Sequence, residues 1–212
     1  MYDTITNSAS FWQSLIEFDL EICRCVQAAG CPWCGGTLDR GDYGRKPRGI
    51  PEALAEAFST RLSTCCRCCR RRVTPPSVRF LGRRVYVGAI MIVATMGALV
   101  CCAAGRTLAR WRAWWTTVLP TTTFWQVACG RLVPAVQTGQ LPGALLRRFE
   151  QSCGGATAEA LVGTLRFLQP VSSRIGEHFD GRQWTGNLAQ KMHFDRDLRI
   201  LLRSNQIPKR LN

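Results

Sequence analysis

The chain has 212 residues, of which 46% are hydrophobic and 20% are charged. This length supports one ordinary domain or two small ones, and the apolar content excludes a generally disordered protein. A formal net charge of +14 is typical of a protein with a polyanionic partner or an anionic membrane surface. Twelve cysteines indicate metal ligation, disulfides or redox chemistry.

The first predicted element is an amphipathic helix over residues 9–29, where apolar side chains recur at three- and four-residue intervals. Ser8 or Ser10 is a candidate cap for its start, and Gly30 is expected to end it. The N-terminus contains acids and lacks the continuous apolar run of a secretory signal. We therefore expect a cytoplasmic, nucleoid-associated protein, whose reducing surroundings favour metal thiolates over disulfides.

The segment CPWCGG at residues 31–36 is typical of a zinc knuckle, because its glycines let backbone amides approach the thiolates. The second cysteine pair that such a site needs lies in CCRCC at residues 65–69, which contains two overlapping frames, Cys65/Cys68 and Cys66/Cys69. A site of four thiolates is closed and structural, since it leaves no position for a reacting water. The predicted ligands of a Zn²⁺ ion are Cys31, Cys34, Cys66 and Cys69.

The positive charge is concentrated in the middle of the chain. No Asp or Glu occurs between Glu56 and Glu150, a stretch of 93 residues that contains fourteen arginines. A segment of this kind, interrupted by aromatic residues, is typical of a nucleic-acid-binding protein, because Arg pairs with phosphate and with guanine edges. The predicted phosphate contacts around the zinc ribbon are Arg70, Arg71, Arg72, Arg79, Arg83 and Arg84.

Residues 85–105 contain no charged side chain, and the run is long enough to span a bilayer. Its many glycines and alanines make it small rather than leucine-rich, so a buried helix explains it too. A single-pass membrane protein with its span at residues 85–104 is therefore an alternative interpretation, although we expect no membrane partner.

The next predicted helix covers residues 105–115 and divides into two faces. Leu108, Trp111 and Trp115 share an apolar face that is expected to pack in the core. A helix that enters the major groove needs such a packed face opposite the side chains that reach the DNA. The candidate DNA contacts of this helix are Arg106, Thr107 and Arg110.

The remaining chain predicts further helices near residues 124–133, 145–151, 158–168 and 195–203, suited to protein contacts or dimerisation. We expect no enzymatic activity, because catalysis of the acid-triad type needs three carboxylates to hold two metal ions, and the acid-free centre supplies none. The acids and histidines near the C-terminus are interpreted as a salt-bridged helix face rather than a metal site: His178, Asp180, His193, Asp195 and Asp197.

Three sequence blocks, CPWCGGTLDRGDYGRKPRG, CCRRRVTPPSVRFLGRRVYVG and RTLARWRAWW, resemble a family of small bacterial proteins that are encoded in or beside transposable elements and are labelled transposase-associated. The resemblance covers roughly residues 9–150. It implies a zinc ribbon followed by a helix-turn-helix, with residues 88–100 as the supporting helix and residues 106–115 as the recognition helix.

The sequence thus predicts a mainly α fold with a small β zinc ribbon. Its expected segments are an N-terminal helix at 1–30, the four-cysteine ribbon at 31–84, a helix-turn-helix-like middle at 85–120 and a helical C-terminal region at 121–212. The predicted function is that of a DNA-binding accessory protein of a mobile element, which works with a separate transposase or recombinase and has no small-molecule substrate. An RNA-binding protein with the same ribbon and basic surface is a further alternative.

Overall fold

The computed structural model describes residues 2–82, 85–98 and 103–172, and these residues form eight α-helices and five short strands. The expected class, mainly helical with a small β ribbon around four cysteines, is confirmed. The expected residues Arg83 and Arg84, the helix near residues 195–203 and the acids and histidines near the C-terminus lie outside the described residues.

The described residues of the N-terminal half contain three α-helices, five short strands and one 3₁₀ turn. Its elements in chain order are α1 (Tyr2–Thr6), α2 (Ala9–Ala29), β1 (Leu38–Arg40), β2 (Tyr43–Gly44), a 3₁₀ turn (Glu52–Leu54), α3 (Ala55–Phe58), β3 (Thr60–Arg61), β4 (Thr64–Cys66) and β5 (Arg72–Val73).

In the second half, all regular elements among the described residues are helical. Its elements are α4 (Gly88–Thr95), α5 (Gly105–Ala113), a π-helical turn (Trp114–Val118), a 3₁₀ turn (Leu119–Thr121), α6 (Thr123–Cys129), a 3₁₀ turn (Thr138–Gln140), α7 (Gly143–Ser152), α8 (Thr157–Leu168) and a final 3₁₀ turn (Gln169–Ser172).

Helix α2 has the bounds that the sequence predicts. The Ser8 hydroxyl caps its start by accepting a hydrogen bond from the Phe11 amide at 3.4 Å. Gly30 ends it with a φ of 78°, a conformation that glycine adopts without steric penalty. One face of the helix is buried along its whole length, and Asp19 lies on that apolar face.

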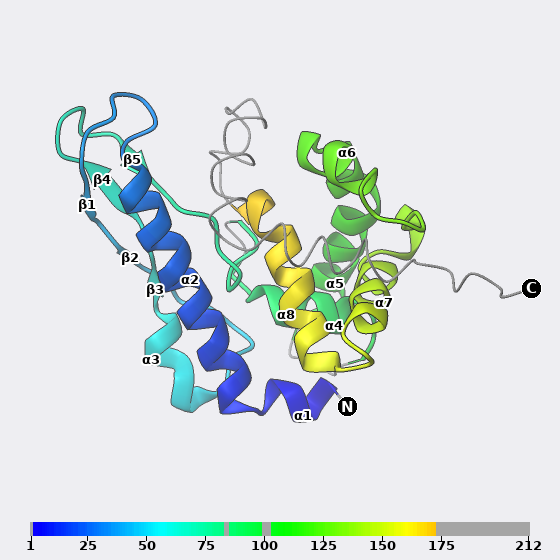
Figure 1. Ribbon diagram of the computed structural model, residues 1–212. Coiled ribbons are helices and arrows are strands. Elements are labelled where there is room, and N and C mark those ends of the chain that lie inside the picture. Colours follow the sequence, from blue (N-terminus) through cyan, green and yellow to red (C-terminus); the bar gives the residue numbers. More distant parts are fainter. Residues whose placement is uncertain (1, 83–84, 99–102, 173–212) are drawn as a thin grey trace, which may run out of the picture.

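The strands form two small antiparallel sheets. One has the order β1-β4-β5, with Leu38 opposite Cys66 and Thr64 opposite Val73. The other pairs β2 with β3, with Tyr43 opposite Arg61. Figure 1 shows the strands alongside the C-terminal half of α2, at the opposite side of the molecule from α5 and α6.

The apolar run after residue 84 forms the buried helix α4. All eight of its residues are buried, as expected for a helix that is hydrophobic on every side. Within residues 2–82, 85–98 and 103–172, no helix combines the length and hydropathy that crossing a bilayer requires.

One hydrophobic core unites residues from each of the expected segments, since it includes Trp12, Phe80, Ile92 and Leu145. Helix α8 packs against α7, α4 and α1. Gly163 of α8 allows the contact with α7, because a Cβ at this position would lie 2.7 Å from the Phe149 ring. The helical body is therefore continuous with the N-terminal helix.

A buried ion pair connects α2 to the segment that follows the ribbon. The Asp19 carboxylate accepts hydrogen bonds from the Arg79 Nε at 2.7 Å, the Ser77 hydroxyl at 2.6 Å and the Val78 amide at 2.7 Å. Asp19 is 1% exposed and Arg79 is 2% exposed. The prediction that Arg79 contacts phosphate is therefore wrong, because its guanidinium is enclosed in the protein.

The rest of the Arg79 guanidinium is also satisfied internally. It donates to the carbonyl oxygens of Ala57 at 3.0 Å and Thr60 at 3.2 Å, and its central carbon lies 5.3 Å and 5.2 Å from the ring centroids of Phe58 and Phe80. Because every charged group of this network has partners, the pair joins α2, α3 and β3 without leaving a buried charge unpaired.

The substitution Asp19→Ala is expected to lower the free energy of unfolding by about 3–5 kcal/mol, because it leaves the Arg79 charge buried without its counterion. Urea denaturation followed by far-ultraviolet circular dichroism measures the change. Glu21→Ala is the control on the same helix, since Glu21 pairs with Arg24 on the surface and its loss is expected to cost less than about 1 kcal/mol. Equal effects of the two changes would contradict the assignment.

Candidate metal centre

Four cysteine thiols meet at the outer end of the ribbon. The sulfur atoms of Cys31, Cys34, Cys66 and Cys69 all lie within 4.8 Å of one another. Two contacts cross between the pairs: Cys31 Sγ lies 3.6 Å from Cys69 Sγ, and Cys34 Sγ lies 3.4 Å from Cys66 Sγ. These four thiols could hold a metal ion, and they are the four that the sequence predicts.

The structure distinguishes between the two frames of the second cysteine pair. Cys66 is fully buried at the end of β4 and points to the first pair, whereas Cys68 is exposed. The Cys65 thiol instead donates to the carbonyl oxygen of Arg70 at 3.5 Å. The alternation of side chains along β4 explains the choice, because neighbouring residues of a strand face opposite sides.

The first pair lies in a tight turn, the first knuckle, formed by residues 31–36. The Gly35 amide donates to the Cys31 carbonyl at 2.8 Å, and the Cys31 amide donates to the Gly36 carbonyl at 2.8 Å. Gly35 has a φ of 69°, which explains the glycine after the second cysteine. This turn is what the CPWCGG motif predicts.

The thiols differ in their affinity for protons. The Cys69 amide donates to the Cys66 Sγ at 3.5 Å, and this hydrogen bond is the main reason that the pKa of Cys66 falls to about 6. The Gly36 backbone lowers the pKa of Cys34, but the neighbouring thiols outweigh this and raise it to about 12. A metal ion that binds here has to displace protons, because the thiolate is the ligand form.

The ribbon has little other material for a core of its own. Its buried apolar cluster consists of Val26, Leu38 and Val73 with two of the cysteines, Cys31 and Cys66. Three aliphatic side chains bury too little surface to hold such a module. The ribbon therefore needs a further stabilising interaction, and a metal ion that cross-links the four thiols would supply it.

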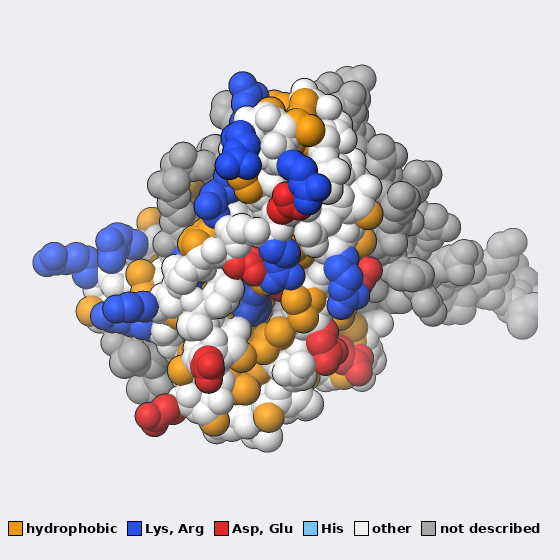
Figure 2. Space-filling model, turned by 90° about the vertical axis from the view of Figure 1, so that its left-hand side faces the viewer, with side chains coloured by type: hydrophobic (Ala, Val, Ile, Leu, Met, Phe, Trp, Pro, Cys, Tyr) orange, Lys and Arg blue, Asp and Glu red, His pale blue; other side chains and the backbone are white. Residues whose placement is uncertain are grey.

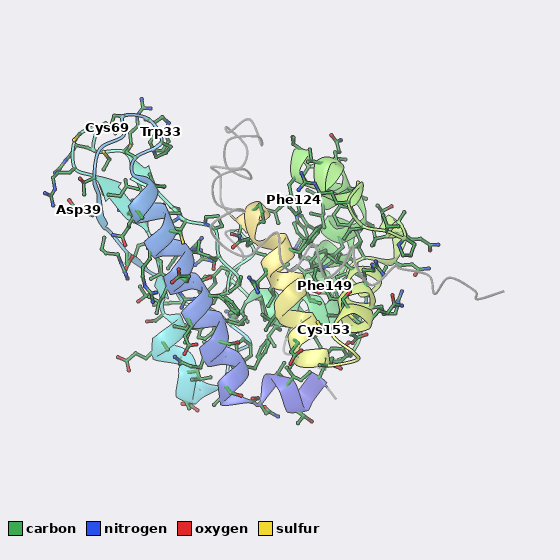
Figure 3. The ribbon with its side chains drawn as sticks, in the orientation of Figure 1. Trp33, Asp39, Cys69, Phe124, Phe149 and Cys153 are labelled. Atoms are coloured by element: carbon green, nitrogen blue, oxygen red, sulfur yellow. The ribbon has the colours of Figure 1, made fainter. Side chains whose placement is uncertain are left out.

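Three predicted phosphate-contact residues, Arg70, Arg71 and Arg72, are exposed on the ribbon. The Arg71 guanidinium lies 5.4 Å from the centroid of the Trp33 ring, and that of Arg72 lies 5.7 Å from the centroid of Tyr43. Arg72 also donates to the Gly41 carbonyl at 2.6 Å. Figure 3 shows Trp33 and Cys69 together at the outer end of the ribbon, with Asp39 further down along the strands.

The acids of the ribbon are paired with other arginines. Arg67 makes two hydrogen bonds to Asp39, at 2.9 Å and 3.1 Å, and Arg40 pairs with Asp42. The Arg67 guanidinium lowers the pKa of Asp39. Among the described residues, no ion pair neutralises Arg70, Arg71 or Arg72, so they give the tip of the ribbon a net positive charge. Sequence reasoning did not foresee the exposed ring of Trp33 in this group.

Helix α5 and the π-helical turn that continues it have the two faces that the sequence predicts. Trp111 and Trp115 are 5% and 0% exposed, whereas Arg106 and Arg110 are exposed and Thr107 is half-buried. The Thr107 hydroxyl accepts a hydrogen bond from Arg110 at 3.4 Å. The basic face is therefore available on the surface.

The pair α4 and α5 departs from a helix-turn-helix in its connection. The two helices are in contact, but nine residues, 96–104, separate them, whereas the motif has a turn of three or four. Residues 99–102 of this connection are outside the described part of the chain. The extended supporting helix expected over 88–100 ends at Thr95.

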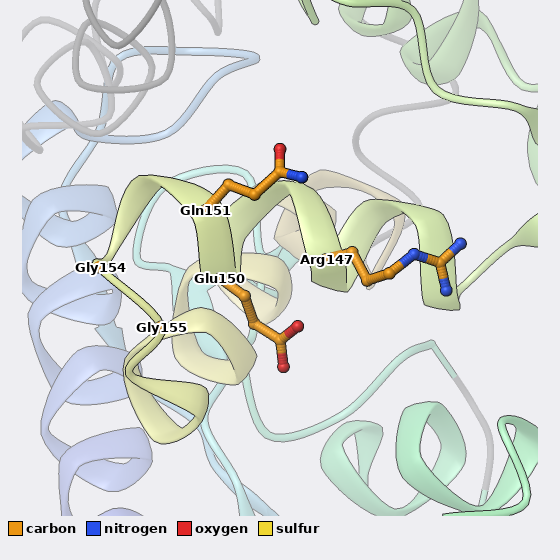
Figure 4. A pocket seen from close by; sticks show the side chains of 5 residues that line it. All are labelled: Arg147, Glu150, Gln151, Gly154 and Gly155. Carbon is orange, nitrogen blue, oxygen red and sulfur yellow. The ribbon is translucent and has the colours of Figure 1, made fainter.

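An open depression lies at the C-terminal end of α7, lined by Arg147, Glu150, Gln151, Gly154 and Gly155 (Figure 4). Glu150 accepts a hydrogen bond from the Tyr2 hydroxyl at 3.1 Å, and partial burial together with this carboxylate raises the pKa of Tyr2 to about 12. The contact joins α1 to α7. We therefore assign a packing role to the residues of this depression, and the thiol cluster remains the candidate functional site.

No family model, curated protein or solved structure matches this chain.

The substitution Cys34→Ser is expected to abolish stoichiometric metal binding, because it removes one of the four thiolate ligands that a closed tetrahedral site needs. Cys68→Ser is the matched control, because Cys68 lies in the neighbouring frame and is exposed; it should retain the metal content of the wild type. Inductively coupled plasma mass spectrometry of the purified variants measures both. Loss of metal from Cys68→Ser but not from Cys34→Ser would contradict the assigned ligand set.

Proposed function

We propose that the chain is a DNA-binding protein whose ribbon is held by zinc, and that it serves as an accessory protein of a mobile genetic element. The observation that carries the proposal is the position of Arg70, Arg71 and Arg72: three exposed arginines directly follow the metal-site residue Cys69, and no acid among the described residues pairs with them. Such a tip attracts the phosphates of a nucleic acid.

The donor set favours zinc as the metal. Tetrahedral coordination with Zn–S bonds of about 2.3 Å separates neighbouring sulfurs by about 3.8 Å. The two sulfur contacts across the cluster, at 3.4 Å and 3.6 Å, are close to this value. Cys31, Cys34, Cys66 and Cys69 together fill the coordination sphere, so the ion would have a structural role and would supply no reactive water.

The distribution of charge supports a polyanionic partner. Figure 2 shows Lys and Arg side chains without acids at the top of the ribbon face, whereas lower on this face Asp and Glu side chains lie beside or below the basic ones. The acids Asp39 and Asp42 are already paired, and a zinc ion with four thiolates has a charge of −2, so the three positive charges of Arg70, Arg71 and Arg72 still exceed the negative charge beside them. Phosphates are the anions that such an arginine group binds in several contacts at once.

Helix α5 supplies a second candidate contact. Arg106 and Arg110 lie on its exposed face, and Trp111 anchors the opposite face against Tyr86, with ring centroids 4.9 Å apart. A helix fixed in this way can present its arginines to a groove or to the backbone of DNA. The ribbon tip and the exposed face of α5 are separate basic surfaces, and one extended polyanion such as DNA could contact both.

The link to a mobile element rests on the resemblance of the ribbon blocks and of RTLARWRAWW to transposase-associated proteins. In that role the chain binds DNA for a separate transposase or recombinase and does not cleave it. No catalytic residue is assigned to it.

The double variant Arg70→Ala/Arg72→Ala is expected to weaken duplex DNA binding and to reduce the slope of log affinity against log salt by about two, since each lost phosphate contact removes about 0.9. Fluorescence anisotropy at four salt concentrations measures the slope. Arg24→Ala/Arg131→Ala removes the same charge from exposed positions outside the ribbon tip and should leave the slope unchanged. A wild type that does not bind DNA at all would refute the proposed function.

A further inference from the structure

The two cysteine pairs lie in equivalent backbone turns, although their sequences differ. In the second knuckle, residues 66–71, the Arg70 amide donates to the Cys66 carbonyl at 3.1 Å, and the Cys66 amide donates to the Arg71 carbonyl at 2.9 Å. These are the two hydrogen bonds that define the first knuckle. Arg70 and Arg71 therefore occupy the places that a Gly-Gly pair occupies in the first knuckle.

Arg70 takes a backbone conformation that favours glycine. Its φ is 59°, and it is the non-glycine residue with a positive φ among the described residues; the equivalent Gly35 has a φ of 69°. A side chain at such a position strains the backbone, and strain of this kind concentrates at functional sites. Folding alone would favour glycine at position 70, so the arginine side chain calls for a functional explanation.

An exposed aromatic ring lies beside these arginines. Trp33, between the two cysteines of the first knuckle, is 46% exposed even with the Arg71 guanidinium against its ring. A large aromatic side chain on the surface contributes little to folding but offers a flat face to a partner. A planar ring and a planar guanidinium are the two groups on which unpaired nucleobases stack.

We propose that the tip formed by Trp33, Arg70 and Arg71 binds an unpaired segment of a DNA strand, with one base stacked on the Trp33–Arg71 pair and Arg70 on an adjacent phosphate. This inference rests on the proposed DNA binding and specifies the form of DNA that the ribbon takes. In a duplex the faces of the bases are covered by their neighbours, so an indole ring has no base face to stack on. The ribbon therefore distinguishes a strand with unpaired bases from a closed duplex.

The test uses the full chain and three labelled DNA probes: a twelve-nucleotide single strand, the same strand with abasic sites throughout its centre, and a duplex closed by a hairpin at each end. The closed duplex exposes no terminal base pair. Trp33→Ala is expected to weaken binding of the single strand about tenfold and to leave the abasic strand and the closed duplex unchanged. Trp33→Phe, which retains a stacking ring, should restore most of the affinity.

The matched control is Val127→Ala, which shortens an exposed apolar side chain on α6, on the opposite side of the molecule from the ribbon (Figure 1). It should bind all three probes like the wild type. Metal content of each variant, measured on the same preparation, separates loss of stacking from loss of the knuckle. Equal weakening by Trp33→Ala on all three probes would overturn the stacking role.

The outcomes also separate this inference from the proposed function. Wild type that binds the closed duplex, with no effect of Trp33→Ala on the single strand, overturns the inference and leaves DNA binding intact. Wild type that binds none of the probes overturns both. Tighter binding of single-stranded RNA than of DNA with the same sequence overturns the assignment to DNA.

Arg70→Gly provides an independent test, because it relieves the backbone and removes the side chain at once. It is expected to raise the midpoint of thermal unfolding or leave it unchanged, and to weaken binding of the single strand and of the abasic strand to the same extent. A variant that is less stable than the wild type and binds both strands normally would show that the arginine has a structural role, and would overturn its assignment to phosphate.

Discussion

The ribbon depends on bonds to sulfur because it lacks a hydrophobic core of adequate size. Val26, Leu38 and Val73 are the aliphatic residues buried beside the cysteines, and such a cluster cannot offset the conformational entropy of ordering the two knuckles. The four thiols lie within 4.8 Å of one another, and a metal ion bound by all of them would supply the missing free energy of folding. The charged tip can then be rigid although almost all of its side chains face water.

The buried Asp19–Arg79 pair carries this rigidity into the helical body. Asp19 belongs to α2, which also supplies Val26 to the ribbon cluster and Trp12 to the main core. The Asp19 carboxylate binds Ser77, Val78 and Arg79, so α2, before the ribbon, is joined directly to the segment after it. Arg79 also donates to the carbonyl oxygens of Ala57 and Thr60. The position of the tip relative to α5 is thereby set by a helix and an ion pair rather than by a linker.

Patterns with a strict spacing could be interpreted from the sequence alone. The cysteine pairs, the helix over residues 9–29 and the two faces of α5 each follow from a local rule. The choice of Cys66 over Cys65 depends on which side of β4 faces the first knuckle, and that is set by strand pairing. Asp19 did carry a signal, since it lies on the apolar stripe of α2 and such an acid needs a buried partner.

Other features depend on contacts distant in the sequence. Arg79 belongs to the same acid-free basic segment as Arg71 and Arg72, and only the fold shows that it meets Asp19, sixty residues away. The apolar run 85–105 fits a membrane span and a buried helix equally well until the packing of α4 is known. The positive φ of Arg70 follows from the equivalence of the two knuckles, which their sequences conceal because Gly-Gly is replaced by Arg-Arg.

The central claim is that an ion held by the four thiols shapes the DNA-binding tip. The most direct measurement is a DNA titration of one preparation before chelation, after complete removal of metal, and after zinc is restored, with bound metal counted at each stage. The account predicts one zinc per chain, a loss of most DNA affinity on removal and its recovery with zinc. Unchanged DNA affinity in the metal-free protein, or protein purified without metal that binds DNA fully, would contradict it.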